Sequence, residues 1–133
     1  MIRPDTDTVL RLHRKLSRET GGDDGIRDAA LLESAIASAY QTFDGQELYP
    51  SVEEKAARLG YALISNHAFV DGNKRIGMLV LLAFLSVNGA PLPKKSGEVA
   101  RVGLAVASGE MRYGDLLSWV RGLGQTPSAH KHE

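Results

Sequence analysis

The segment from about Asn73 to Asn88 constrains the fold more than any other part of this chain. It reads as a helix, and Met78 to Leu85 contains no polar side chain. A helix that is apolar on nearly all sides is stable only where other elements cover it. The apolar run from Ile76, broken only by Gly77, is too short to cross a bilayer, which needs about 20 residues. We therefore predict a buried central helix in a globular domain.

Apolar residues spaced three and four apart predict about five further helices around this one. Gly21-Gly22 end the first, Asn88-Gly89 end the central one, and no segment shows sustained strand alternation. The fold class is therefore predicted as all-α, a compact single-domain bundle of about six helices. The apolar stripes are Val9, Leu12 and Leu16; Leu31, Leu32, Ala35, Ile36 and Ala39; Ala56, Leu59, Leu63 and Ile64; Val99, Val102 and Val106; and Leu116, Leu117, Val120 and Leu123.

Local signals place helix starts and one turn. Asp28 is a good N-cap, and Ser51 followed by Glu54 forms a capping box. Between them, Asp44-Gly45 within residues 41–50 predicts a short hairpin. We assign residues 1–124 to one domain and residues 125–133, with His130 and His132, to a disordered tail.

Composition excludes several classes of function. Sixteen Lys and Arg balance sixteen Asp and Glu, which argues against a nucleic-acid-coating protein. There is no cysteine, which excludes disulfides, thiolate metal sites and a cysteine nucleophile. The first residues are polar and lack the apolar core of a signal peptide. We expect a cytoplasmic protein with no membrane and no nucleic-acid partner.

Chemistry is concentrated in the turn before the central helix, residues 67–77. Lys74 and Arg75 fall in the first helical turn, where cations are unfavourable by about 0.3–1 kcal/mol each. An anionic ligand would compensate them, because helix N–H groups and two cations would converge on one phosphate. Gly72 allows close backbone approach, and Asn73 can donate or accept there. We predict that Gly72, Asn73, Lys74 and Arg75 form a phosphate cradle.

Two further side chains complete this hypothesis. Asp71 offers a hard oxygen ligand for Mg²⁺, which prefers one or two carboxylates together with phosphate oxygens. His67 ends the preceding helix, and an imidazole can act as general base near neutral pH. Each residue also has a plainer interpretation: Asp71 as an N-cap, His67 as a helix C-terminal histidine, and the two cations as solvated charges. Their coincidence in one turn favours function.

The string His67-Ala68-Phe69-Val70-Asp71-Gly72-Asn73-Lys74-Arg75 resembles the H-x-F-x-[D/E]-x-N-K-R motif of the Fic/Doc (Fido) superfamily, in its Doc, or death-on-curing, branch. The similarity covers roughly residues 5–123. It implies an all-α fold in which His67 activates a target hydroxyl and Asp71 binds Mg²⁺ beside ATP. It also implies a flap that docks the target protein, carried over to Thr42, Phe43, Asp44, Gly45 and Tyr49.

Two departures from the AMP-transferring members bear on the reaction. Many of the AMP-transferring enzymes that this chain resembles have a glycine at the position of Lys74. They also have a second arginine at the position of Met78. The Doc branch shares the pattern found here. That resemblance implies a toxin that transfers the γ-phosphate of ATP to a Thr or Ser hydroxyl of elongation factor Tu and blocks translation.

Regulation and alternatives complete the predictions. The chain has no copy of the inhibitory [S/T]-x-x-x-E-[G/N] motif, so the resemblance implies an antitoxin that supplies an inhibitory segment in trans. AMP transfer to a protein hydroxyl is the alternative reaction. A non-catalytic module that binds a nucleotide or a partner is the second alternative, although it would need neither His67 nor Asp71. Metal-dependent hydrolysis is weaker, since no further ligand sits at useful spacing.

Overall fold

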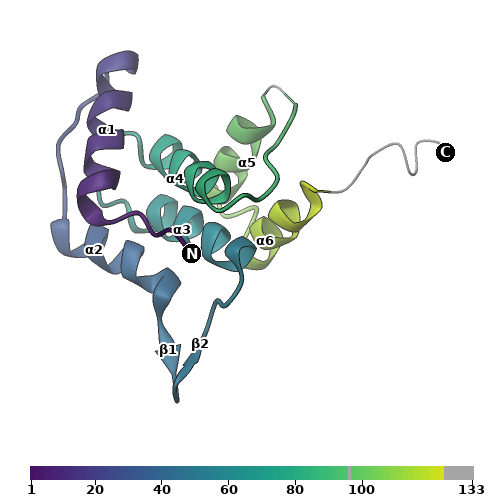
Figure 1. Cartoon of the computed structure of the whole chain (residues 1–133). Helices are drawn as coiled ribbons and strands as arrows, with labels where there is room; N and C mark the ends of the chain where they lie inside the picture. The colour runs from purple at the N-terminus through teal and green to yellow at the C-terminus, as the bar shows by residue number, and fades with distance from the viewer. Residues whose placement is uncertain (96, 125–133) are drawn as a thin grey trace.

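The computed structural model describes residues 1–95 and 97–124, and the predicted tail lies outside this range. Within it the chain is helical except for one small hairpin and the connecting loops (Figure 1), so the predicted all-α fold is confirmed. The elements are α1 (Thr6–Thr20), α2 (Ala29–Ala37), a 3₁₀ turn (Ser38–Tyr40), β1 (Thr42–Phe43), β2 (Gln46–Glu47), α3 (Val52–Asn66), α4 (Asn73–Val87), α5 (Glu98–Ala107) and α6 (Tyr113–Gly122).

Helices α3 and α4 form the centre of the molecule and cross at two glycines. A Cβ on Gly77 would lie 2.5 Å from Ile64 Cγ1 and 3.0 Å from the carbonyl oxygen of Gly60. A Cβ on Gly60 would lie 2.8 Å from Leu81 Cδ1. Only residues without side chains allow this close backbone approach. The crossing brings the end of α3 and the start of α4 together in one tight turn.

The prediction that α4 is buried on all sides is wrong for one of its sides. Leu81 and Phe84 are fully buried, but Leu79 and Leu82 are half-buried and Val87 is 50% exposed. A groove between α4 and α5 runs along part of this side. No helix in the described range is long and apolar enough to cross a bilayer.

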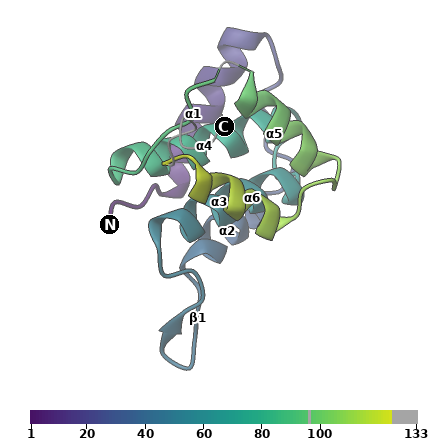
Figure 2. The ribbon, with the colours of Figure 1, turned by 90° about the vertical axis from the view of Figure 1, so that its right-hand side faces the viewer.

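The predicted caps and hairpin are confirmed. Asp28 accepts from Leu31 N at 3.0 Å, and Ser51 and Glu54 make both bonds of a capping box. In the hairpin, Thr42 pairs with Glu47 and Phe43 with Gln46. Asp44 and Gly45 both have positive φ, 54° and 80°, which is the conformation of a two-residue hairpin turn. The hairpin projects from the body of the molecule in both ribbon views (Figure 2).

Candidate functional site

The turn between α3 and α4 opens onto a pocket of about 290 Å³. All six residues predicted to act as base, metal ligand or phosphate cradle line it: His67, Asp71, Gly72, Asn73, Lys74 and Arg75. Ala107 from α5 closes one side. The turn therefore collects the residues that the sequence pattern singled out into one shared space.

His67 is the C-cap of α3, and its side chain is exposed to the pocket. Its backbone is left-handed, with φ 52° and ψ 48°, a conformation that few non-glycine residues adopt. Arg27 holds it there, because its Nε donates to the His67 carbonyl at 2.8 Å and its Nη2 to the Asn66 carbonyl at 3.4 Å. The imidazole is thus presented from a backbone fixed by a guanidinium at the helix end.

The residues before α2 form a strap along this turn. Backbone N–H groups of Arg27 and Asp28 both donate to the Ala68 carbonyl, at 2.8 and 3.0 Å. Val70 N donates to the Gly25 carbonyl at 3.0 Å. These bonds surround an isolated antiparallel bridge between Ile26 and Phe69. They pair the main chain of the turn with the strap in the way that neighbouring strands pair. The turn is therefore held by a segment some forty residues earlier in the chain.

Asp71 directly precedes the N-cap of α4, which is Gly72 and not Asp71. Its Oδ1 accepts from the Gly72 N–H at 2.8 Å, and the residue is exposed. A Cβ on Gly22 would lie 2.7 Å from Asp71 Oδ2, so the glycine leaves room for the carboxylate. The described residues contain no cluster of three metal-ligating side chains. One carboxylate suits Mg²⁺ held jointly with phosphate oxygens and water.

The start of α4 carries unpaired donors and two cations. The first helical bond runs from Ile76 N to the Gly72 carbonyl at 2.9 Å. The N–H groups of Asn73, Lys74 and Arg75 lie before it and have no acceptor within the helix. Gly72 has φ 79° and supplies no side-chain cap. Lys74 and Arg75 are exposed, and Arg75 Nη1 donates to Thr20 Oγ1 at 3.2 Å. This helix end is electropositive and open to an anion.

The Asn73 side chain bonds the turn itself, although we expected it to face a ligand. Its Oδ1 accepts from Phe69 N at 3.0 Å, and its Nδ2 donates to the Phe69 carbonyl at 2.9 Å. Both ends of the amide are therefore used to close the turn onto itself. The side chain thus braces the turn, and one Nδ2–H donor remains beyond the bond to Phe69.

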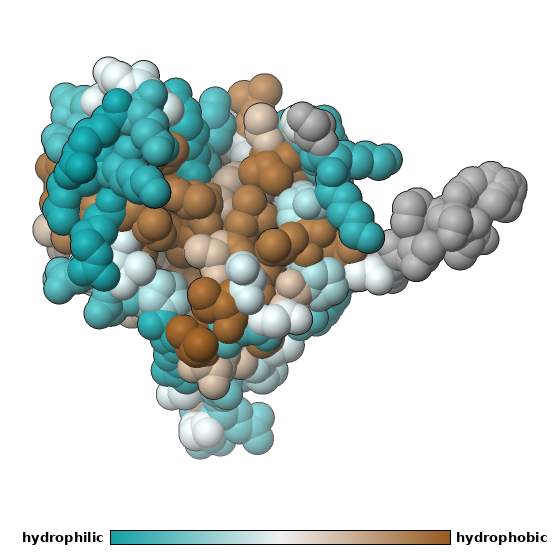
Figure 3. All heavy atoms as spheres, turned by 45° about the horizontal axis from the view of Figure 1, so that its top comes forward, coloured by the Kyte–Doolittle hydropathy of each residue, from teal (hydrophilic) through white to brown (hydrophobic). Residues whose placement is uncertain are grey.

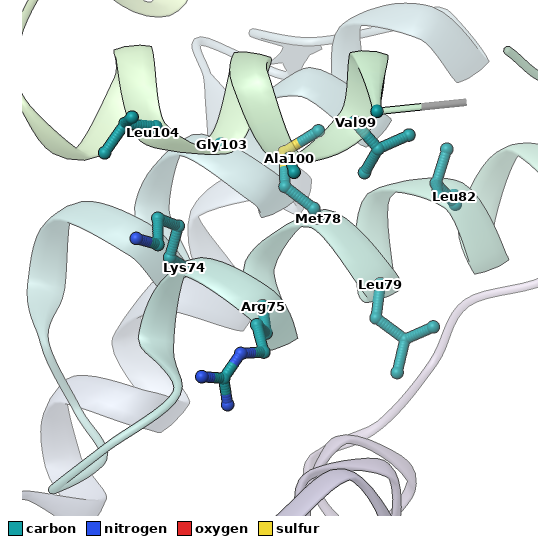
Figure 4. A pocket seen from close by; sticks show the side chains of 10 residues that line it. Lys74, Arg75, Met78, Leu79, Leu82, Val99, Ala100, Gly103 and Leu104 are labelled. Atoms are coloured by element: carbon teal, nitrogen blue, oxygen red, sulfur yellow. The ribbon is translucent and has the colours of Figure 1, made fainter. Parts of the chain in front are cut away.

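A larger groove of about 670 Å³ adjoins the pocket and shares Lys74 and Arg75 with it. Its other lining residues are almost all apolar and come from α4 and α5. Figure 4 shows the two cationic groups at the start of α4 and Met78 further along, between the two helices. Figure 3 shows a broad band of apolar side chains across the middle of one face of the molecule. The site thus combines an electropositive end with an apolar trough.

The structure places the predicted flap residues outside this pocket. Thr42, Phe43, Asp44 and Gly45 are exposed on the hairpin, with Phe43 75% exposed, while Tyr49 is half-buried at its base. Tyr49 packs edge-on against Tyr113 at 5.4 Å. Burial is the main cause that raises the pKa of the Tyr113 phenol to about 12. The flap has a packed base and a free tip.

A buried lysine ties the flap to α3. Lys55 is 0% exposed, its Nζ bonds Glu47 Oε1 at 2.6 Å, and it also donates to the Tyr49 carbonyl. The ammonium group beside it holds the pKa of the Glu47 carboxyl below its usual value. Lys55 lies in the same helix that ends at His67. The flap and the site are therefore connected through α3.

Lys55→Met should loosen the flap without unfolding the protein. Lys55 is buried but Glu47 is exposed, so methionine fills the space of the lysine stem and leaves the Glu47 carboxylate in water. The hairpin loses the two charge-assisted bonds that Lys55 makes to Glu47 and to the Tyr49 carbonyl. Amide hydrogens of residues 42–47 should exchange about tenfold faster or more. The Glu47 pKa should return towards its usual value. In the wild type, the stabilisation from the Lys55–Glu47 contact is fully present above the usual pKa of a glutamate. It is lost as pH falls through the lowered pKa of Glu47.

Hydrogen exchange followed by NMR measures the first effect and an NMR pH titration of the Glu47 carboxyl the second, with Lys94→Met as control. Unchanged exchange in the hairpin would show that Lys55 does not hold it.

Sequence reasoning missed three residues that shape the site. The sequence pattern assigned no role to Arg27, Lys55 or His13. His13 is buried and bonds the Asp71 carbonyl. A signal existed for two of them, because His13 and Lys55 are polar residues in register with the apolar stripes of their helices.

Residues 3–85, more than half of the chain, match the Fic/DOC family. The chain therefore belongs to the Fic/DOC family. Among individual proteins, it is similar to Toxin Doc of Mycolicibacterium smegmatis, with 43% identity over 72 residues. The aligned part is 54% of this chain and 55% of that protein, so the chain spans about half the length of this relative.

Proposed function

We propose that this protein is a Doc-like toxin of a toxin–antitoxin system and a Mg²⁺-dependent kinase that transfers the γ-phosphate of ATP to a Thr or Ser hydroxyl of a target protein. Membership of the Fic/DOC family and similarity to Toxin Doc support a nucleotide-using transferase and a toxin. The specific target, by resemblance elongation factor Tu, is part of the proposal. Blocked translation would follow from its modification.

The chemistry follows from the residues in the turn. A ring nitrogen of His67 takes the proton from the target hydroxyl, whose oxygen forms a new bond to the γ-phosphorus. The bond from that phosphorus to the β–γ bridging oxygen breaks, and ADP leaves. Lys74, Arg75 and the unpaired N–H groups of α4 stabilise the negative charge on the transferred group. The Asp71 carboxylate would hold Mg²⁺, which would supply charge neutralisation to the phosphate groups.

The observation that carries the choice of γ-phosphate is the groove next to the cradle. Met78 and its neighbours make the trough beyond Lys74 and Arg75 apolar, and the described residues that line it include no further cation. Such a surface suits a nucleoside and disfavours a trailing β,γ-diphosphate. We infer that the γ-phosphate occupies the cradle while the nucleoside lies in the groove. AMP transfer would require the opposite orientation.

Ala100→Trp should block nucleotide binding by filling this groove. Ala100 is exposed on α5 and lines the groove, so an indole there displaces no core residue. We expect the affinity for ATP to fall about tenfold or more, the equivalent of about 1.4 kcal/mol of lost contact. Titration calorimetry measures it, and Arg101→Trp on the same helix serves as a control outside the groove. Unchanged affinity in Ala100→Trp would place the nucleoside elsewhere.

The flap and an antitoxin complete the proposal. An exposed aromatic residue at a sheet edge, here Phe43, suits docking of an extended target segment. Similarity to Toxin Doc supports control by a separate antitoxin.

Labelled ATP decides between the two reactions. The protein is incubated with bacterial lysate and ATP carrying label on the α- or the γ-phosphate, with His67→Ala in parallel. The proposal expects His67-dependent label on protein from the γ position alone. Label from the α position would establish AMP transfer, and no His67-dependent label would favour the non-catalytic binding module.

A further inference from the structure

His13 touches the candidate site from behind, although it lies in α1, far from the turn in sequence. It is 1% exposed, and its ring stacks on Phe69 with centroids 3.7 Å apart and planes at 12°. Its Nε2 lies 2.8 Å from the carbonyl oxygen of Asp71. A carbonyl oxygen only accepts, so Nε2 carries the proton and donates.

The other ring nitrogen makes the residue unusual. Nδ1 is buried and has no hydrogen-bond partner in the part of the chain that the structure describes. An unpaired buried polar atom is unfavourable, and a phenylalanine could stack on Phe69 without this defect. Packing alone therefore does not account for a histidine here. The bond to Asp71 is the one thing that an apolar ring could not supply.

The bond from His13 is one of two hydrogen bonds made by the Asp71–Gly72 peptide unit. The peptide between Asp71 and Gly72 has its carbonyl bonded to His13 at 2.8 Å and its N–H bonded to Asp71 Oδ1 at 2.8 Å. Because a peptide unit is planar, fixing the carbonyl direction also fixes the N–H direction. Gly72 has φ 79° and no Cβ, so its own backbone restrains the orientation of this peptide less than a residue with a side chain would. The direction of the Gly72 N–H in turn sets the position of the Asp71 carboxylate, which accepts from it.

We propose that His13 is a positioning residue that fixes the Asp71–Gly72 peptide plane and thereby aims the Asp71 carboxylate into the phosphate pocket. The proposal rests on the proposed function, in which Asp71 binds Mg²⁺ with ATP. Outer partners of this kind commonly change metal affinity 10–100-fold when removed. His13 acts through the backbone and touches neither the metal nor the substrate.

Two variants separate the donor from the ring. His13→Phe keeps a flat ring on Phe69 and removes the donor, whereas His13→Gln keeps an N–H donor of similar reach and loses the ring. Asp71→Asn serves as the reference for loss of the carboxylate itself. For each variant we would measure thermal stability, exchange of the Gly72 amide hydrogen by NMR, and ATP binding by calorimetry across a Mg²⁺ titration and in EDTA.

We expect His13→Phe to keep its melting temperature, to speed Gly72 amide exchange, and to raise the Mg²⁺ concentration for half-maximal ATP binding about tenfold or more. ATP binding in EDTA should stay unchanged, and His13→Gln should recover most of the Mg²⁺ response.

Other outcomes would overturn the proposal in distinguishable ways. If Asp71→Asn shifts the Mg²⁺ response and His13→Phe does not, His13 only packs and the proposed function stands. Equal losses in His13→Phe and His13→Gln, with lowered melting temperatures, would also show a packing role. If Asp71→Asn itself leaves the Mg²⁺ response unchanged, the metal assignment fails and the positioning role fails with it.

Discussion

Replacing His67 by alanine is expected to slow phosphate transfer about 10²–10⁴-fold while the affinity for ATP stays unchanged. The imidazole contacts the attacking hydroxyl in the proposed reaction, and the phosphate cradle is built by other residues. A base that acts only on the nucleophile contributes to the transition state and little to nucleotide binding. Single-turnover transfer from labelled ATP, with calorimetry for binding, separates the two quantities.

The left-handed backbone at His67 requires a matched control. Alanine is strained at φ 52°, so His67→Ala could act by moving the turn. Asparagine tolerates this conformation and cannot serve as a base near neutral pH. His67→Asn should therefore lose as much activity as His67→Ala, and added imidazole should partly restore activity to His67→Gly. Substantial activity in His67→Asn would show that position 67 contributes geometry and not a base.

Removing the cations of the cradle is expected to have opposite effects on activity and stability. Lys74→Ala and Arg75→Ala should each slow transfer about 10²–10³-fold, as is usual when a preorganised donor to a transition-state anion is lost. Without ligand, Lys74→Ala should stabilise the protein by about 0.3–1 kcal/mol, because a cation leaves a helix N-terminus. Arg75→Ala should gain less, since its bond to Thr20 is lost too.

Kinetics and chemical denaturation of the ligand-free protein test this pair. Lys94→Ala, which removes an exposed cation outside both cavities, should change neither quantity. Lys74→Arg keeps the charge and tests whether its placement matters. A Lys74→Ala protein that is less stable without ligand would contradict the idea that this cation is present for an anion and not for the fold.

The fold was predictable from the sequence because most of its signals are local. Periodicity, the cap at Asp28 and the capping box at Ser51 depend on residues a few positions apart. The prediction that α4 is buried on all sides was wrong because burial depends on contacts between distant segments. Whether Leu79 and Leu82 are covered depends on where α5 packs, and no local pattern encodes that position.

The site was only partly predictable for the same reason. The turn from His67 to Arg75 is continuous in sequence, so its residues were found as a set. The groups that hold the turn come from α1 and from the strap before α2. The bonds from His13 to Asp71 and from Arg27 to His67 join residues 58 and 40 positions apart. Spacing along the chain carries no record of such contacts, although a histidine in an apolar stripe was a visible hint.

In the proposed reaction, one turn binds the γ-phosphate and activates the hydroxyl that receives it. The most direct measurement is the intact mass of the purified target after reaction with ATP, together with the nucleotide product. We expect the target to gain one phosphoryl group and ADP to form in equal amount, and we expect neither with His67→Asn. A target that gains a nucleotidyl group with release of pyrophosphate, or that is modified equally by His67→Asn, would contradict the proposed reaction.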